Sequence, residues 1–160
     1  MKKSVYLDAT ILCYLFDERD SIREYIAVTR RWWAEERRRY DLRVSDETIA
    51  ELSEGDYPRK TEVLACATQL QILPPAPEIL EITRVYLDNY VMPQTLRGDA
   101  LHLAYASFYK CDFVLTWNCN HLANASKRQH IRIINARLNL PSPEIATPLE
   151  LFEESDHEDQ

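Results

Sequence analysis

The chain contains only two glycines, Gly55 and Gly98, among its 160 residues, and this scarcity narrows the folds open to it. Tight turns and phosphate-binding loops need glycine, because glycine adopts positive φ angles without steric cost. Neither a G-x-x-x-x-G-K motif nor a G-x-G-x-x-G motif occurs in the sequence. An all-β fold, which needs many tight turns, is also disfavoured. The chain is therefore predicted to be dominated by helices.

Short apolar segments alternate with longer helical patterns along the chain. Strands are expected at residues 4–7, 42–44, 72–73 and 113–116, with a further extended piece near residue 145. Helices are expected at residues 10–16, 21–39, 47–54, 58–70, 78–90, 99–109 and 118–138. This alternation predicts the α/β fold class, with a three-layer α/β/α sandwich around a central, mostly parallel sheet.

The net charge of −7 is concentrated at the C-terminal end of the chain. Residues 150–160 hold six acids and no Lys or Arg, which leaves 19 bases against 20 acids in the remainder. We expect one domain over residues 1–149, followed by an acidic, solvated tail over residues 150–160. A body this close to neutral argues against a large non-specific nucleic-acid binder, although an enzyme with a local RNA-binding patch is compatible with it.

Location and redox state follow from two further patterns. No apolar run is long enough to span a membrane, and Asp8 interrupts the N-terminal segment too early for a signal peptide. We therefore expect a cytoplasmic protein without a membrane partner. The four cysteines include no C-x-x-C pair, so they are expected to be reduced and structural rather than zinc ligands.

Acidic and amide side chains follow the predicted strands near the points where the strands end. Asp8 directly follows the first strand, and Glu51 lies on the helix after the second. Asp99 opens the helix that leads to the last core strand, and Asn118 follows that strand. Ligands of parallel α/β sheets bind at the carboxyl ends of the strands, so these four side chains are expected to converge there.

Each of these residues also has an ordinary structural explanation when it is considered alone. Asp8 and Asp99 are suitable helix caps, and Glu51 shares a helix face with two further glutamates that water would solvate. An acid between two apolar segments, such as Asp8, is nevertheless costly unless it is paired, hydrogen-bonded or metal-bound. His102 lies one turn after Asp99 on an apolar helix and is expected to be a packing residue, with catalysis as the minor alternative.

The order of these residues resembles the PIN-domain family, and within it the VapC-type toxins of bacterial toxin–antitoxin pairs. The matching blocks are VYLDAT (5–10), SDETIAEL (45–52), DALHLAYA (99–106) and VLTWNCNHL (114–122). The resemblance implies a metal-dependent endoribonuclease that uses Mg²⁺ or Mn²⁺ and forms a homodimer inhibited by a cognate antitoxin. It also implies a metal bound by Asp8, Glu51 and Asp99, with Thr10 and Thr116 as supporting hydroxyl residues.

The chain departs from the family pattern at the fourth acidic position, which is Asn118. Asparagine offers an amide oxygen but no charge, so Asn118 either completes the catalytic site or marks an inactive PIN-fold binding protein. Asp112 precedes the last core strand and is not expected to replace the missing acid. A phosphotransfer enzyme with Asp8 as nucleophile is disfavoured, because the second acid that such phosphatases need two residues later is Thr10.

An RNA substrate that approaches an acidic pocket needs basic residues nearby. The candidate RNA-binding residues are Arg97, Lys127 and Arg128, with Trp117 as a ring on which a base would stack. A second cluster contains the arginines at positions 30, 31, 37, 38 and 39. For that cluster RNA, a second subunit, an acidic partner and plain solvent all remain open.

Overall fold

The computed structural model describes residues 1–89, 91–92, 97–118 and 125–152. Its strands are β1 (Lys3–Leu7), β2 (Tyr40–Ser45), β3 (Gln71–Leu73), β4 (Phe113–Leu115) and β5 (Glu144–Ala146). Its α-helices are α1 (Ala9–Phe16), α2 (Arg23–Glu35), α3 (Asp46–Ser53), α4 (Lys60–Thr68), α5 (Pro77–Asp88), α6 (Arg97–Phe108) and α8 (Ala125–Arg137). Two short 3₁₀ turns, η1 (Asp20–Ile22) and η2 (Arg37–Arg39), flank α2.

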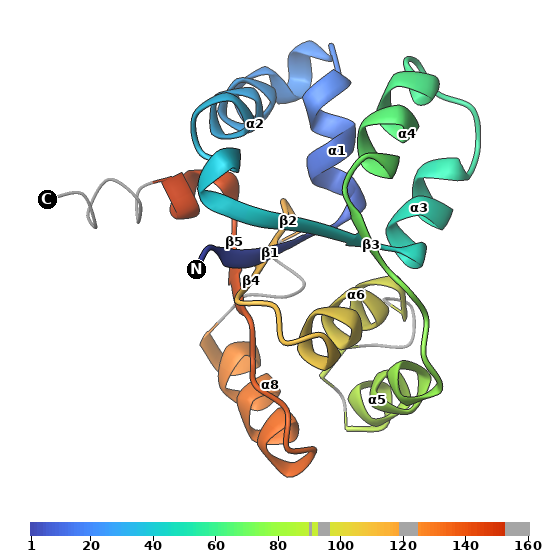
Figure 1. Cartoon of the computed structure of the whole chain (residues 1–160), viewed down its shortest axis with the longest axis vertical. Helices are drawn as coiled ribbons and strands as arrows, with labels where there is room; N and C mark the ends of the chain where they lie inside the picture. The colour runs from blue at the N-terminus through green and yellow to red at the C-terminus, as the bar shows by residue number, and fades with distance from the viewer. Residues whose placement is uncertain (90, 93–96, 119–124, 153–160) are drawn as a thin grey trace, which may run out of the picture.

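The five strands form one parallel sheet in the order β3-β2-β1-β4-β5. Helices α1 to α4 cover one face of this sheet, and α5, α6 and α8 cover the other (Figure 1). The predicted three-layer α/β/α sandwich is therefore confirmed, and the sheet is parallel throughout. All strands point the same way, so their carboxyl ends meet at one edge of the sheet.

The alternation of side chains along β1 connects the two layers of helices. Val5 and Leu7 belong to the core under α1 to α4, whereas Tyr6 points into the core beneath α5, α6 and α8. All three side chains are fully buried. A central parallel strand is covered on both faces, which explains why this segment reads as a continuous apolar run.

Several predicted element boundaries are wrong, each for a local reason. The helix predicted over residues 21–39 is α2 alone, because residues 37–39 form the separate turn η2. Helix α3 begins at Asp46 rather than at residue 47, because Ser45 caps it through a reciprocal pair of hydrogen bonds between Ser45 and Thr48. Helix α4 begins at Lys60, after Arg59 adopts a left-handed conformation with φ 62°. Of the helix predicted over residues 118–138, residues 119–124 lie outside the described part.

A short helical segment ends the described part of the chain. Residues 148–152 are helical, and Leu151 is fully buried in the core shared with α1 and α2. The acidic residues from 153 onward lie outside the described part of the chain. None of the described helices combines the length and the apolar character that crossing a membrane demands.

Tyr86 of α5 connects the three helices on its face of the sheet, α5, α6 and α8, through buried hydrogen bonds. Its hydroxyl lies 2.5 Å from Asn135 Oδ1 on α8 and 3.1 Å from Ser107 Oγ on α6. Burial raises the pKa of Tyr86 to about 12, against the lowering effect of these hydrogen bonds. Burial therefore keeps the Tyr86 hydroxyl neutral, and the network satisfies its hydrogen bonds inside an otherwise apolar layer.

We expect Tyr86→Phe to lower the free energy of unfolding by about 1–2 kcal/mol, because the buried side-chain oxygen of Asn135 loses the hydrogen bond from the Tyr86 hydroxyl. Urea denaturation measures the difference. The matched control is Tyr109→Phe, whose hydroxyl donates to the Pro74 carbonyl at an exposed position. A Tyr86→Phe protein no less stable than this control would contradict the role of the network.

Candidate active site

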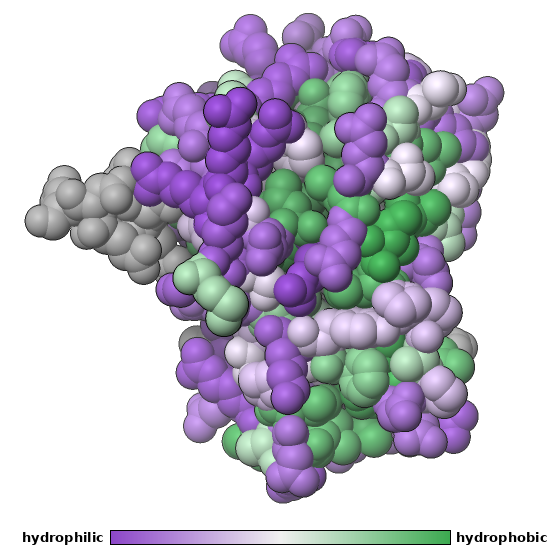
Figure 2. All heavy atoms as spheres, in the orientation of Figure 1, coloured by the Kyte–Doolittle hydropathy of each residue, from purple (hydrophilic) through white to green (hydrophobic). Residues whose placement is uncertain are grey.

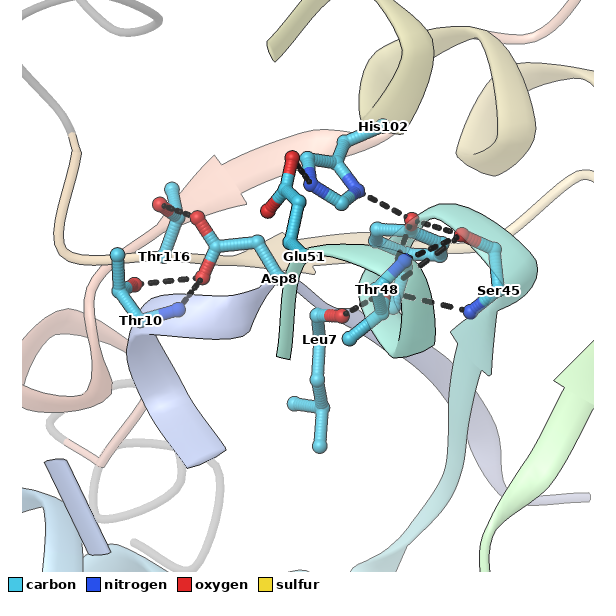
Figure 3. Close-up of polar contacts among 9 residues, drawn as sticks. Leu7, Asp8, Thr10, Ser45, Thr48, Glu51, His102 and Thr116 are labelled. Carbon is cyan, nitrogen blue, oxygen red and sulfur yellow. Dashed lines mark hydrogen bonds and ion pairs between the residues drawn. The ribbon is translucent and has the colours of Figure 1, made fainter. Parts of the chain in front are cut away.

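Asp8 stands at the carboxyl end of β1 and caps the N-terminus of α1. Its carboxylate is 2% exposed and accepts hydrogen bonds from three groups (Figure 3). The backbone N–H of Thr10 donates to Oδ1 at 3.0 Å, the Thr10 hydroxyl donates to the same oxygen, and the Thr116 hydroxyl donates to Oδ2. Asp8 thus caps α1 and is at the same time a buried acid whose oxygens are hydrogen-bonded. The sequence had offered these as two separate explanations for an acid at this position.

The two threonines also connect Asp8 to the segment that follows β4. The Thr10 hydroxyl accepts the Trp117 N–H at 3.1 Å, and the Thr116 hydroxyl accepts the Asn118 N–H at 2.9 Å. Each threonine hydroxyl thus donates its single hydrogen to Asp8, while its oxygen accepts a backbone N–H. Thr10 and Thr116 therefore contact Asp8 as expected of supporting residues, and they place half-buried Asn118 beside it.

The pKa of Asp8 is raised from its ordinary value. Burial is the main cause, and the charge of Asp99 raises it further, against the lowering effects of His102 and the two threonine hydroxyls. Asp99 lies in the first turn of α6 and is half-buried. Because its charge acts on Asp8, the two acids share one electrostatic environment although 91 positions separate them in the sequence.

Glu51 enters the same region from α3 and is bound by His102 of α6. His102 Nε2 lies 3.0 Å from Glu51 Oε1, and His102 Nδ1 lies 2.5 Å from the Tyr6 hydroxyl. The Tyr6 hydroxyl in turn contacts Ser45 Oγ at 2.6 Å and Thr48 Oγ1 at 3.2 Å. Figure 3 shows this row of contacts running from Glu51 to the N-terminus of α3.

His102 is buried as expected, but it contacts a candidate site residue directly. Burial lowers its pKa, yet the hydrogen bond and charge of Glu51, together with the charges of Asp8 and Glu47, outweigh burial and raise it. Asp8 and Glu51 thus both act on His102, so all three share one electrostatic environment. The i, i+3 spacing from Asp99 was the sequence signal that could have included His102 in the site.

The described structure does not gather the acids into a metal-binding cluster. Among the residues it describes, no three His, Cys, Asp or Glu side chains are placed to hold one metal ion together. Asp8 is bound to threonine hydroxyls, and Glu51 is bound to His102. The charge of Asp99 acts on Asp8, and Asp8 and Glu51 both act on His102, whereas the convergence of the three acids and their role as metal ligands stay predictions.

The candidate RNA-binding residues are largely engaged within the protein. The Trp117 ring stacks on Tyr14 and contacts Tyr25 edge-on, and its Nε1 donates to Thr29 Oγ1 at 2.8 Å. Arg128 donates to the Ile145 carbonyl at 3.4 Å. Lys127 is half-buried, and Arg97 is the first residue of α6, with its side chain outside the described part. Their RNA contacts stay predictions.

The arginines of η2, at positions 37–39, and Asp112 lie at the amino ends of β2 and β4, away from this edge of the sheet. The arginines of η2 precede β2, on a part of the surface where hydrophilic side chains gather (Figure 2). Asp112 precedes β4 and accepts the Ser4 N–H at 2.8 Å at the amino end of β1. Asp112 therefore does not replace Asn118, as the sequence indicated.

The comparisons with known proteins agree with this fold. The PIN domain family model matches residues 5–126. VapC20 of Mycobacterium tuberculosis, a toxin that cleaves the sarcin–ricin loop, is 14% identical, with a TM-score of 0.55 over 69% of this chain and 87% of its own. A toxin–antitoxin complex from Klebsiella pneumoniae contains a chain that is 17% identical, with a TM-score of 0.57 over 91% of this chain and 98% of its own.

The search of curated proteins found no significant match. At these low identities the structural similarity supports the fold alone, whereas the family model covers most of the chain. The parallel sheet, the acids at the carboxyl ends of its strands and the family match all agree, and the protein belongs to the PIN domain family.

Proposed function

We propose that this protein is a metal-dependent endoribonuclease that hydrolyses RNA phosphodiester bonds. The observation that carries the proposal is Asp8, a buried acid whose pKa is raised by burial and by Asp99. A fold pays in stability for buried carboxylates that repel one another, and a bound cation removes that cost. The similar VapC20 structure, described as a toxin that cleaves the sarcin–ricin loop, supports RNA as the substrate.

The donor set suits Mg²⁺ or Mn²⁺. Asp8, Glu51 and Asp99 offer carboxylate oxygens and Asn118 offers an amide oxygen, and hard divalent cations prefer oxygen ligands. We infer that these four residues hold the ion. When it is bound, such an ion supplies a water of lowered pKa and neutralises charge on the attacked phosphate.

The protein's own residues orient and balance this site. Thr10 and Thr116 hold Asp8 through their hydroxyls, and by accepting the N–H groups of Trp117 and Asn118 they also fix the segment after β4. Because Asn118 stands at the fourth acidic position, the site carries one negative charge fewer than the family pattern, which favours the approach of a negatively charged phosphodiester. We also propose that Lys127, Arg128 and Trp117 contact the RNA along this edge.

We further propose that the protein is the toxin of a toxin–antitoxin pair, acts in the cytoplasm as a homodimer and is inhibited by a cognate antitoxin. The Klebsiella pneumoniae toxin–antitoxin complex, whose chain is similar over 91% of this one, supports such a partner. A catalytically inactive PIN-fold binding protein is the alternative, which Asn118 favours because a fourth carboxylate is missing.

We expect Asp8→Asn to reduce metal-dependent RNA cleavage by about 100-fold or more, since even groups that only orient a metal ligand are worth 10–100-fold. Cleavage of a fluorescent RNA in Mg²⁺ measures it. Asp112→Asn, which removes a carboxylate at the opposite end of β4, is the control and is expected to cleave normally. Undiminished cleavage by Asp8→Asn would refute the site.

Asp8 also predicts a pH dependence of stability in the absence of metal. Its raised pKa means that the folded chain binds this proton more tightly than the unfolded chain does. The free energy of unfolding is therefore expected to fall as the pH rises from about 4 through the raised pKa. Urea denaturation at several pH values measures this slope. The Asp8→Asn protein should show a shallower slope and greater stability at pH 7, and an identical slope would show that Asp8 is not its cause.

Asn118→Asp tests the fourth position. An added carboxylate is expected to tighten Mn²⁺ binding about tenfold and to lower the unfolding temperature of the metal-free protein, because like charges then repel more strongly. Calorimetric titration with Mn²⁺ and thermal unfolding measure the two effects. Wild-type protein that binds no Mn²⁺ at millimolar concentration, beside an Asn118→Asp protein that binds it, would favour the inactive alternative.

The toxin role predicts growth arrest when the protein is expressed from an inducible promoter. Expression of the Asp8→Asn variant at the same level should leave growth unaffected, because RNA cleavage is the cause of arrest. Co-expression of the small reading frame that neighbours the gene should rescue growth. Equal arrest by both proteins would contradict a toxicity that depends on this site.

A further inference from the structure

Glu51 is the acid whose placement depends most on a single neighbouring element. It projects from α3 with a side chain that is 31% exposed, so solvent alone would leave it several rotamers. One of its oxygens, Oε1, nevertheless lies against α6, where it meets His102 and Gly98, while Glu47 of α3 also hydrogen-bonds to the Glu51 carboxyl. The other oxygen turns toward Asp8 in Figure 3.

The first neighbour is His102. A carboxylate only accepts hydrogen bonds, so His102 Nε2 carries the hydrogen and donates to Oε1 across 3.0 Å. The imidazole itself is 2% exposed, and its other nitrogen is held by the fully buried Tyr6 hydroxyl. Tyr6 is fixed in turn by Ser45 at the start of α3. The His102 imidazole that donates to Glu51 is therefore held by a hydrogen bond at each of its two ring nitrogens.

The second neighbour is Gly98, one turn earlier on α6. A Cβ at this position would lie 2.9 Å from Glu51 Oε1, which is closer than such atoms approach one another. Gly98 has no positive φ to explain its presence, in contrast to Gly55 with φ +68°. In the first turn of a helix alanine is otherwise the more favourable residue. The missing side chain makes room for the Glu51 carboxylate.

We propose that Gly98 and His102 together form a notch on α6 that orients the Glu51 carboxylate, so that Oε1 is held by the helix and Oε2 is turned to the acidic pocket. This Glu51 notch, made of the bare Cα of Gly98 and the Nε2–H of His102, makes both residues positioning residues that act through Glu51. The inference rests on the proposed function, because it assumes that Glu51 binds the metal ion. Groups that orient a ligand in this way typically change metal affinity 10–100-fold.

Gly98→Ala is the sharpest test, because it fills the notch without removing any polar group. The clashing atom is the end of a flexible side chain, so Glu51 is expected to swing away at little cost to folding. We expect an unfolding temperature only a few degrees below that of the wild type, because the buried His102 Nε2–H loses its acceptor, and Mn²⁺ affinity, measured by calorimetry, that is at least tenfold weaker. The matched control is Gly55→Ala, which strains a left-handed backbone position where an added Cβ meets no described atom within 4 Å, and which should lower stability while it leaves Mn²⁺ affinity unchanged.

A double-mutant cycle shows whether the notch acts through Glu51. In a Glu51→Ala background the added methyl group at position 98 meets no described atom within 4 Å, and the Nε2–H of His102 loses its Glu51 acceptor. Gly98→Ala and His102→Ala are therefore expected to weaken Mn²⁺ binding in the wild-type background and to have no further effect beside Glu51→Ala. Losses that persist undiminished in that background would overturn the proposal, as would wild-type affinity in the Gly98→Ala protein.

A measurement without metal separates this inference from the proposed function. The Nε2–H of His102 is buried and hydrogen-bonded, so its proton signal in ¹H–¹⁵N spectra is expected to exchange slowly with water. Gly98→Ala and Glu51→Gln should each shift that signal and speed its exchange. If the wild type bound no Mn²⁺ and cleaved no RNA, the nuclease proposal would fail while these shifts still supported the notch. An unchanged His102 signal in both variants would overturn the notch itself.

Discussion

The buried carboxylate of Asp8 is the constraint around which the rest of the site is organised. A charge that is 2% exposed at the end of a central strand is expensive unless its oxygens are satisfied. The hydroxyls of Thr10 and Thr116 satisfy it, and they bind the backbone after β4 at the same time. The geometry of the pocket and the joining of β1 to β4 therefore depend on the same few hydrogen bonds.

Neutral and basic groups balance the other acids of the pocket. His102, whose pKa is raised chiefly by Glu51 against the effect of burial, places a basic ring between α3 and α6. At the fourth position Asn118 contributes an amide in place of a further charge. The metal-free protein thus keeps several carboxylates near one another by surrounding them with donors, at a cost in stability that is typical of functional sites.

The acidic side chains at the two ends of the parallel sheet make different kinds of contact. At the amino end, Asp112 hydrogen-bonds to Ser4 and only joins neighbouring strands. At the carboxyl end, Asp8 follows β1 and is acted on by the charge of Asp99 from α6, while Asp8 and Glu51 of α3 both act on His102. Two acids on the same pair of strands, Asp8 and Asp112, therefore differ in role because strand direction places them at opposite edges.

The sequence by itself determined the fold class and the region of the site. Apolar periodicity and helix caps are local signals, so residues 4–7 and 113–116 could be recognised as strands, and the acids after them could be assigned to one edge. Only the tertiary structure decided that His102 binds Glu51, that Gly98 leaves space for that carboxylate and that Trp117 packs on Tyr14. Those contacts join side chains from elements far apart in the chain, and their geometry depends on how whole helices pack, which no local pattern encodes.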